Sequence, residues 1–164
     1  MTLPARPRGQ AGRGVDEVSA HDKRIIEHLQ QDGRRPFTQI AAELGVSEAA
    51  VRARTNRLVE RGILQVVGVT DPLKLGFQQQ AMIGVRCERD RLLQVADAVS
   101  AFPEVDYVVI TAGAFDLLIE VVCENNEALL QFLTEKLRAV DGVRETETFV
   151  YLRMVKQTYQ WGTR

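Results

Sequence analysis

Hydrophobic and polar positions alternate with helical spacing in residues 37–58, the stretch around which the rest of the chain is organised. A short helix is predicted first, because its apolar residues share one face, and Gly45 stands where a left-handed residue commonly ends a helix. Ser47 is placed to cap a second helix, and Glu48 suits the positive end of that helix. The residues predicted to be buried are Ile40, Ala41, Leu44, Val46, Val51, Thr55 and Leu58. Two helices joined by so tight a turn form a helix-turn-helix.

The second helix carries Arg52, Arg54 and Arg57 on the face opposite its apolar residues. Arginines on the free face of a helix suit the major groove of DNA, where they form bidentate hydrogen bonds with guanine or bind phosphate. The candidate DNA contacts are Thr38, Gln39, Ser47, Glu48, Ala50, Arg52, Arg54 and Arg57. The structural alternative is a helical hairpin with a solvated basic face, in which an arginine only holds an acid such as Glu48 or Glu60.

The segments on either side of this motif complete a small domain. A capping box at Ser19 and Asp22 predicts a preceding helix that ends near Gly33. Gly62 ends the arginine-bearing helix, and residues 63–70 are predicted to form a two-stranded wing or one bent strand. The expected unit is a winged helix-turn-helix.

From residue 78 onward the hydrophobic period changes from helical to alternating, which is the period of a strand. Strands are predicted at 78–88, 105–111, 115–123 and 143–155. The helices between them are predicted to bury Leu92, Leu93, Ala96 and Val99 in the first, and Leu129, Leu130, Leu133 and Leu137 in the second. The order βαββαβ is the split ferredoxin-like arrangement, so the predicted fold class is α+β.

These elements predict the following division of the chain: a disordered basic tail at 1–17, the winged helix-turn-helix at 18–71, a linker at 72–78, the βαββαβ domain at 79–157 and a C-terminal tail at 158–164. In a βαββαβ fold both helices lie on one face of the sheet. Because the third strand is apolar at both parities, both faces are expected to be covered, with Leu118 and Val122 on one side and on the other Phe115, Leu117, Ile119 and Val121. A second copy of the chain is the expected cover.

Composition and charge agree with two small domains. The chain has 164 residues, of which 45% are hydrophobic, an ordinary share for a globular protein. Residues 1–64 carry 11 Lys/Arg and 8 Asp/Glu, a balance of +3, and residues 65–164 carry 10 and 14, a balance of −4, which together give the overall −1. The basic half coincides with the helix-turn-helix, which is compatible with DNA as a partner.

Several other classes of protein are disfavoured by the sequence. No apolar run is long enough to cross a membrane and no signal-peptide core is seen, so a cytoplasmic protein is expected. Cys87 and Cys123 lie in strand-like runs and are expected to be buried thiols. His21 and His28 have no cluster of further ligands around them, so neither a metal site nor a cofactor is predicted.

The chain resembles the Lrp/AsnC family of "feast or famine" regulators. The resemblance is carried by Asp22-Lys23-Arg24-Ile25-Ile26, Asp32-Gly33-Arg34, the helix-turn-helix at 37–58, Arg61-Gly62-Ile63-Leu64, Leu75-Gly76 and Thr111-Ala112-Gly113-Ala114-Phe115-Asp116. It departs from the family at Val18-Ser19, where Leu-Asp is usual. The resemblance implies a bacterial or archaeal, nucleoid-associated transcriptional regulator that binds double-stranded DNA. It also implies a C-terminal domain, called RAM, that forms dimers sheet against sheet, and dimers that assemble into tetramers or octamers.

The resemblance further implies that a small molecule, commonly an amino acid, binds between dimers near the Gly113 turn. The candidate effector residues are Thr111, Ala112, Gly113, Ala114, Asp116, Thr146 and Thr148. In the functional interpretation, exposed N–H groups of the turn hold a carboxylate and Asp116 faces an ammonium. The structural alternative is a hairpin that needs positive φ at Gly113 and an Asp that accepts turn N–H groups.

Two other functions remain as alternatives to a ligand-sensing regulator. A sirohaem-decarboxylase-like enzyme on the same architecture would need histidines in the C-terminal domain, and no histidine follows His28. An effector-independent protein that only compacts DNA is the second alternative. The leading prediction is therefore a regulator without enzymatic activity.

Overall fold

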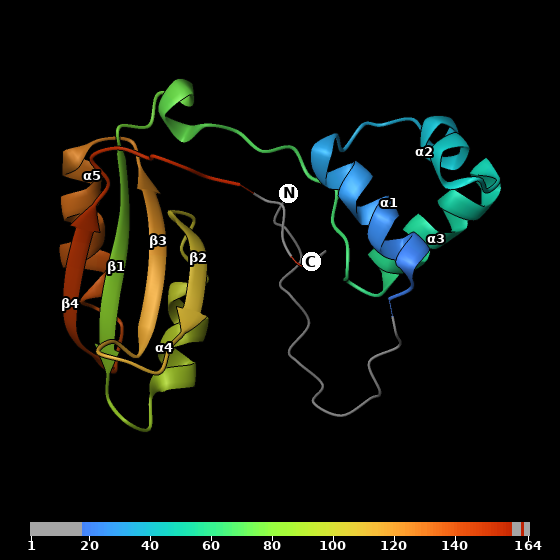
Figure 1. The fold of residues 1–164 in the computed structure, drawn as a ribbon. Helices are drawn as coiled ribbons and strands as arrows, with labels where there is room; N and C mark the ends of the chain where they lie inside the picture. The colour runs from blue at the N-terminus through green and yellow to red at the C-terminus, as the bar shows by residue number, and fades with distance from the viewer. Residues whose placement is uncertain (1–17, 159–161, 163–164) are drawn as a thin grey trace. The chain divides into compact units, whose positions relative to one another are not determined.

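The protein is described here by a computed structural model that places residues 18–158 and residue 162. The predicted tail at 1–17 lies outside these residues, as does most of the tail at 158–164. The chain divides into two compact units, one spanning Val69–Lys156 and the other formed by the residues up to Gly68 and from Gln157 onward (Figure 1). Each unit has its own hydrophobic core.

The N-terminal unit is a bundle of three helices, α1 (Ala20–Gln31), α2 (Phe37–Leu44) and α3 (Glu48–Glu60). The capping box at the start of α1 is present, and Gly45 ends α2 with a φ of 67°. The predicted burial of α2 and α3 is confirmed, with Val46 half-buried against the core. The helix-turn-helix therefore has the register that its apolar pattern predicted.

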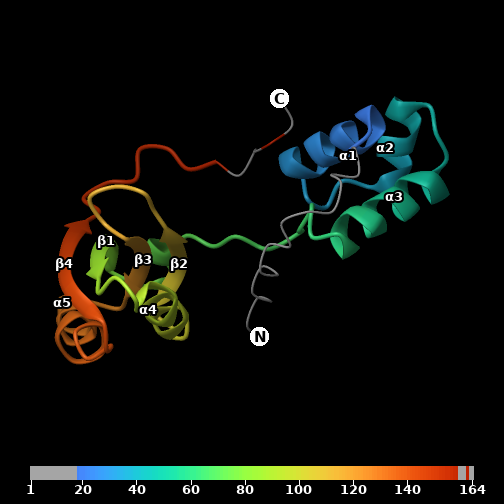
Figure 2. The same ribbon diagram turned by 90° about the horizontal axis from the view of Figure 1, so that it is seen from below.

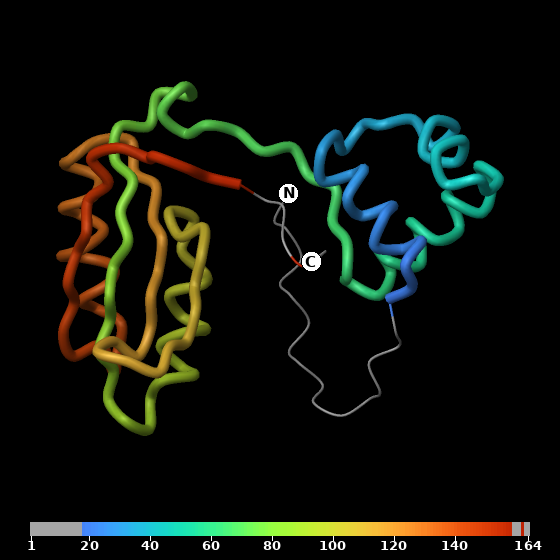
Figure 3. The backbone as a smooth tube through the Cα atoms, viewed as in Figure 1, coloured from blue at the N-terminus to red at the C-terminus, as the bar shows by residue number. Residues whose placement is uncertain are grey.

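The predicted wing is wrong. Residues 63–70 form no strand, although they contain several of the β-branched residues typical of one (Figure 1), and the path of the backbone through them can be followed in Figure 3. Leu64 is buried against the helices, whereas Val66, Val67 and Val69 are about half exposed. A strand needs a paired neighbour, and the described part of this unit supplies none.

A short 3₁₀ helix, η1 (Pro72–Leu75), precedes the C-terminal unit, which is a four-stranded antiparallel sheet with two helices. Its elements are β1 (Gln79–Cys87), α4 (Leu92–Val99), β2 (Val105–Ile110), β3 (Leu117–Cys123), α5 (Asn126–Gln131), the π-helical segment η2 (Phe132–Leu137) and β4 (Val143–Val150). The strand order is β2-β3-β1-β4, which confirms the ferredoxin-like topology. The third and fourth strands are shorter than predicted, beginning at Leu117 and ending at Val150.

Both helices cover the same face of the sheet (Figure 2). Ala81, Ile83 and Val85 of β1 and their neighbours on β3 are buried against them. Two predicted core residues are instead exposed: Leu93 is 70% exposed and Leu130 is 53% exposed. Other residues of the two helices are buried in their place.

Val95 in α4 and Phe132 at the start of η2 are buried. In α4 the inward face is made by residues 92, 95, 96 and 99, which are spaced three and four apart, and Leu93 falls off that stripe. In the second helix the chain widens into η2 at Phe132, where the ring packs edge-on against Phe102 at 5.7 Å between centroids. A π-helical turn changes which side chains face inward, and the regular helical period could not indicate it.

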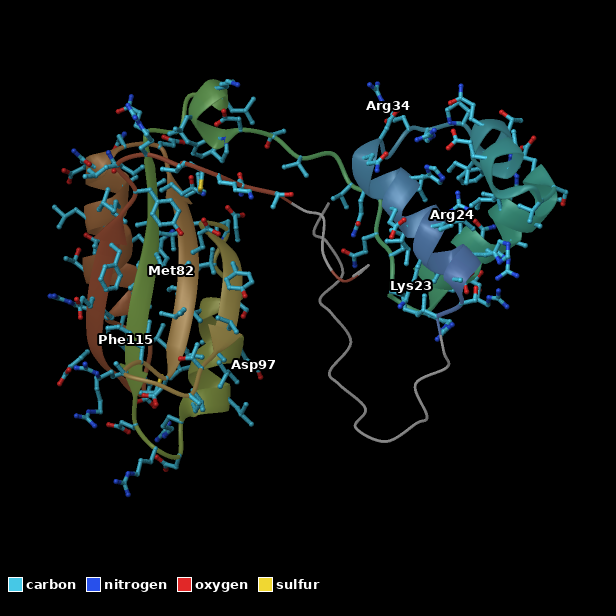
Figure 4. All side chains as sticks on the ribbon, in the orientation of Figure 1. Lys23, Arg24, Arg34, Met82, Asp97 and Phe115 are labelled. Atoms are coloured by element: carbon cyan, nitrogen blue, oxygen red, sulfur yellow. The ribbon has the colours of Figure 1, made fainter. Side chains whose placement is uncertain are left out.

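The opposite side of the sheet carries no helix in the described chain. We call it the open face, and it comprises Gln80, Met82, Tyr107, Val109, Leu118, Glu120, Val122, Glu147 and Phe149, with the ring of Phe115 lying over Gly84. Figure 4 labels Met82 and Phe115 on this side. The parity of the third strand predicted Phe115 beside Leu117, which is wrong because the strand begins only at Leu117 and the preceding ring turns back over β1.

Candidate functional site

Helix α3 is held at its N-terminal end and along its buried side by contacts that the sequence pattern anticipated. The Ser47 hydroxyl accepts a hydrogen bond from the Ala50 N–H at 3.2 Å, which caps the first turn. The backbone N–H of Val46 donates to Ala41 at 3.1 Å, which closes the turn between the two helices. Val51, Thr55 and Leu58 are buried, so the rotation of α3 about its axis is fixed.

Arg54 does not lie on the free face of α3, which corrects its sequence-based placement. Its guanidinium donates to the Asp22 carboxylate of α1 at 3.0 Å and to the Ser19 hydroxyl at 3.3 Å. The Asp22 side chain is 7% exposed, whereas its neighbours Lys23 and Arg24 remain exposed (Figure 4). Arg54 therefore ties the N-terminus of α1 to the middle of α3.

The electrostatics of this contact favour an ionised Asp22. Burial raises the pKa of the Asp22 carboxyl, but hydrogen bonds from Ser19 and Arg54 and the Arg54 charge outweigh burial, so the net pKa is lowered. The same carboxylate accepts the Ser19 backbone N–H at 3.1 Å, completing the capping box. One buried charge thus serves both as the cap of α1 and as the anchor of α3.

The other two arginines of α3 remain at the surface. Arg52 pairs with Glu48 at 2.6 Å, one helical turn away, and its guanidinium carbon lies 5.2 Å from the centre of the Phe37 ring. This is the alternative in which an arginine holds an acid, although the Arg52 side chain is still 58% exposed. Arg57 is exposed and forms no ion pair within the described chain.

The exposed side of α3 forms an open hollow of about 450 Å³. It is lined by Glu48, Ala49, Arg52, Ala53 and Asn56, which we call the outer stripe. Sequence reasoning missed Ala49, Ala53 and Asn56 because it followed the arginines rather than the helical period. Of the remaining predicted contacts, Ser47 and the α2 residues Thr38 and Gln39 are exposed and Ala50 is half-buried.

The turn between β2 and β3 is closed by hydrogen bonds that involve its flanking residues. The Thr111 N–H donates to the Asp116 carbonyl at 2.9 Å, and the Thr111 hydroxyl donates to the Phe115 carbonyl. Ala112, Gly113 and Ala114 are exposed. The expected positive φ at Gly113 is wrong: Gly113 is not among the positive-φ glycines, and an added Cβ would meet nothing within 4 Å.

Asp116 is anchored to the neighbouring strand rather than to its own turn. Its carboxylate oxygen Oδ2 accepts the Cys87 backbone N–H at 2.8 Å, and its own N–H donates to the Val85 carbonyl at 2.9 Å. Burial, with the nearby Asp116 charge, raises the pKa of the Cys87 thiol. The acid is therefore half-buried at the junction of turn and sheet, with one carboxylate oxygen already engaged.

Two side chains support this turn from the open face. The Arg86 Nε–H donates to the Ala114 carbonyl at 2.9 Å, while its guanidinium lies 5.1 Å from the centre of the Phe115 ring and pairs with Glu145. The Phe115 ring fits over Gly84 so closely that a Cβ at Gly84 would lie 2.6 Å from it. Sequence reasoning did not single out Gly84 or Arg86.

Thr146 and Thr148 do not share a cleft with Asp116. They pair with Val85 and Ile83 and so lie on the helix side of β4, an edge strand separated from β3 by β1. Thr146 instead lines a separate hollow of about 440 Å³ with Arg138 and Arg144. The two parts of the predicted effector set are therefore not brought together within one chain.

Comparison with known proteins decides the family. The sequence model described as the Lrp/AsnC ligand binding domain matches residues 80–161, half of the chain, and the one described as the AsnC-type helix-turn-helix domain matches residues 19–59. The chain belongs to the Lrp/AsnC family. The two matches cover the two units described above, so the helix-turn-helix and the sheet domain of this Lrp/AsnC protein are both assigned.

Individual relatives agree with this assignment. An uncharacterized HTH-type transcriptional regulator of Pyrococcus horikoshii is 36% identical over 90% of this chain and 90% of the relative. The HTH-type transcriptional regulator LrpA of the same organism is 31% identical over 85% of this chain and 99% of its own. The chain is thus a DNA-binding transcriptional regulator of the Lrp/AsnC type and no enzyme, and the sirohaem-decarboxylase alternative is set aside.

Solved structures share the fold. AsnC of Escherichia coli superposes with a TM-score of 0.80 at 23% identity, covering 88% of this chain and 98% of that one. A transcriptional regulator of Neisseria meningitidis, solved as a complex with L-methionine, also gives 0.80 at 23% identity, covering 89% and 97%. In the described part of this chain, no helix is long and apolar enough to span a bilayer, and no group of His, Cys, Asp and Glu residues is arranged to hold a metal.

Proposed function

We propose that this regulator reads DNA through the exposed side of α3 and senses an amino acid at the turn of residues 111–116. The proposed DNA contacts on and beside α3 are Ser47, Glu48, Ala50, Arg52 and Arg57. Thr38 and Gln39 of α2 are proposed to reach the phosphate backbone of the DNA. Arg54 is left out of this set, because its guanidinium is bound to α1. Thr146 and Thr148 are left out of the effector set for the reason of geometry given above.

The observation that carries the DNA assignment is the outer stripe of α3. A recognition helix must present an accessible face to the major groove. The outer stripe and Arg57 lie on the accessible side of α3, where Arg52 remains 58% exposed despite its contact with the Phe37 ring, and the opposite side of the helix is buried. The N-terminus of α3, which Ser47 caps, also carries the positive end of the helix dipole, and this end attracts anions such as phosphate.

The assignment of an amino-acid effector rests on the turn and on the family. The exposed tip of Ala112, Gly113 and Ala114 allows close approach, and the Asp116 oxygen that is not bonded to Cys87 can accept from an ammonium. The two relatives solved with L-methionine, from Neisseria meningitidis and Mycobacterium tuberculosis, support an amino acid as the ligand class. A ligand at such a turn changes assembly only by its differential affinity for two states.

We also infer that the chain is a homodimer through the open face, with dimers assembling further into tetramers or octamers. The open face has no cover in the described chain, yet Phe149 and Tyr107 on it are 46% and 47% exposed. An apolar sheet face in water favours a partner of the same shape. Light scattering of the full chain at micromolar concentration tests this, and a clean monomer would contradict it.

The test of DNA binding is Arg57→Ala in the full chain. Arg57 is exposed, so the variant should fold normally. If Arg57 contacts a base, discrimination at one operator position should fall by about 1–3 kcal/mol. If it contacts phosphate, all sequences should bind more weakly and the salt dependence should flatten. Gln31→Ala, an exposed change on α1, is the matched control, and a gel shift of Arg57→Ala equal to this control would show that the assigned side of α3 is wrong.

The test of sensing is a calorimetric screen of the twenty amino acids, followed by sizing of the full chain with any ligand that binds. Asp116→Ala should remove the ligand response and leave ligand-free DNA binding near normal. Equal ligand binding by wild type and Asp116→Ala would place the sensor elsewhere. The absence of any binding amino acid, with DNA binding intact, would favour the effector-independent alternative.

A further inference from the structure

Asn56 is the one polar residue of the outer stripe whose side chain forms no hydrogen bond or ion pair within the described residues. Asn56 is also exposed. The other polar members of the stripe are engaged with each other, since Arg52 pairs with Glu48 at 2.6 Å and lies against the Phe37 ring. Asn56 is therefore the member whose hydrogen-bonding groups are wholly available to DNA.

The residues that precede Asn56 on the stripe allow it to reach base edges. Ala53 and Ala49 lie about one and two turns before it on the same side of α3, and both are exposed. Alanine has no side chain beyond its methyl group, so the backbone of α3 can approach the floor of the major groove closely. A short side chain such as asparagine can reach a base only where the helix comes that near.

The chemistry of the Asn56 amide selects among the bases. Its NH₂ group donates hydrogen bonds and its carbonyl oxygen accepts them, side by side. In the major groove adenine presents the complementary pair, the N7 acceptor and the N6–H donor, whereas guanine presents two acceptors. We propose that Asn56 is a specificity-determining residue of this regulator, through which α3 selects an adenine in each half-site. The inference rests on the DNA-reading role of α3 proposed above.

The test is selection of bound duplexes from a random DNA pool by the full chain. Wild type should enrich a motif with adenine at one position of each half-site. Asn56→Ala should remove the preference for adenine over guanine at that position, which a bidentate contact makes about 5- to 150-fold, and should leave the other positions unchanged. Asn56→Arg should change the enriched base at that position to guanine. Gln31→Ala should reproduce the wild-type motif.

Three results would overturn the inference, and they differ from one another. A motif unchanged in Asn56→Ala would mean that Asn56 does not touch bases. Weaker binding by Asn56→Ala with no change at any position would mean a phosphate contact. If wild type enriches no sequence at all, both the DNA-reading role of α3 and the inference about Asn56 are wrong. If only the inference about Asn56 is wrong, wild type still enriches a motif. Because Asn56 is exposed, the circular dichroism spectrum of each variant should match wild type.

Discussion

Arg54→Met tests whether Arg54 is a structural residue rather than a DNA contact. Methionine keeps an unbranched apolar stem and removes the guanidinium, so the 3.0 Å ion pair to Asp22 and the 3.3 Å hydrogen bond to Ser19 are lost together. Asp22 then remains as a buried carboxylate without its cation. The perturbation thus removes a connection between α1 and α3 while keeping an unbranched apolar stem at residue 54.

The expected magnitude lies between two reference cases. Exposed ion pairs contribute about 0–1 kcal/mol, and breaking a fully buried pair costs about 3–5 kcal/mol. Here the Asp22 side chain is 7% exposed but that of Arg54 is 34% exposed, so water screens part of the attraction. Ser19 also continues to donate its N–H and hydroxyl to Asp22. We therefore expect the free energy of unfolding of the N-terminal unit to fall by about 2 kcal/mol.

The effect should depend on pH in a defined direction. The pKa of Asp22 is lowered in the folded chain, so its ionised contacts stabilise the fold above the unfolded value of about 3.9, and that contribution is lost as pH falls through the lowered folded pKa. The stability difference between wild type and Arg54→Met should be fully present at neutral pH. It should shrink once the solution is more acidic than about pH 4.

The assay is urea unfolding of the full chain, followed by far-ultraviolet circular dichroism, with Arg57→Met as the matched control. Arg57 is exposed and has no ion pair in the described chain, so its replacement should change stability by less than about 0.5 kcal/mol. A double-mutant cycle with Asp22→Asn should give a coupling energy of about 0.5–3 kcal/mol between residues 22 and 54. Equal stabilities of the two arginine variants, or additive effects in the cycle, would refute the reasoning.

Two further predictions concern the C-terminal unit. Gly84→Ala should destabilise it by about 1–3 kcal/mol, because the new Cβ would lie 2.6 Å from the Phe115 ring. Gly113→Ala should change its stability by no more than about 0.5 kcal/mol, because a Cβ there would meet nothing within 4 Å. Thermal unfolding of the two variants measures this difference. Burial, together with the charge and hydrogen bond of Glu120, raises the pKa of Tyr151 to about 12. Because an unfolded tyrosine loses its proton near pH 10, stability should fall as pH rises above about 10, and less steeply in Glu120→Gln, as urea midpoints at about pH 8 and about pH 11 would show.

The sequence predicted the helix-turn-helix well because local rules govern that segment. The left-handed Gly45 and the Ser47 cap depend only on their immediate neighbours, and the burial of Val51 and Leu58 follows from helical spacing. Arg54 was misplaced because it lies at the border of the buried face, three residues after Val51. Its partner Asp22 is 32 residues away in the sequence, and no periodicity reports a contact of that range.

The remaining errors share a cause, since each depends on what lies opposite a residue. The residues at 63–70 have the composition of a strand, but no described strand pairs with them. Gly113 was expected to need positive φ because hairpins often do, yet the turn is closed by Thr111 and Asp116 in another geometry. The position of the Phe115 ring over Gly84 depends on where β3 begins, a boundary that alternation places only within a few residues.

The edges of the sheet limit how copies of this domain can associate. In the order β2-β3-β1-β4, strands β2 and β4 each have one side that no described strand pairs with, and unpaired strand edges invite aggregation by strand addition. Each of these strands meets its neighbour with a register shift, at Val105/Tyr107 and at Arg86/Cys87, and β4 carries charged residues along its length. Irregular, charged edges resist the continuous growth of a sheet. The association through the open face that we propose would thereby be kept separate from the uncontrolled fibre formation to which open sheets are prone.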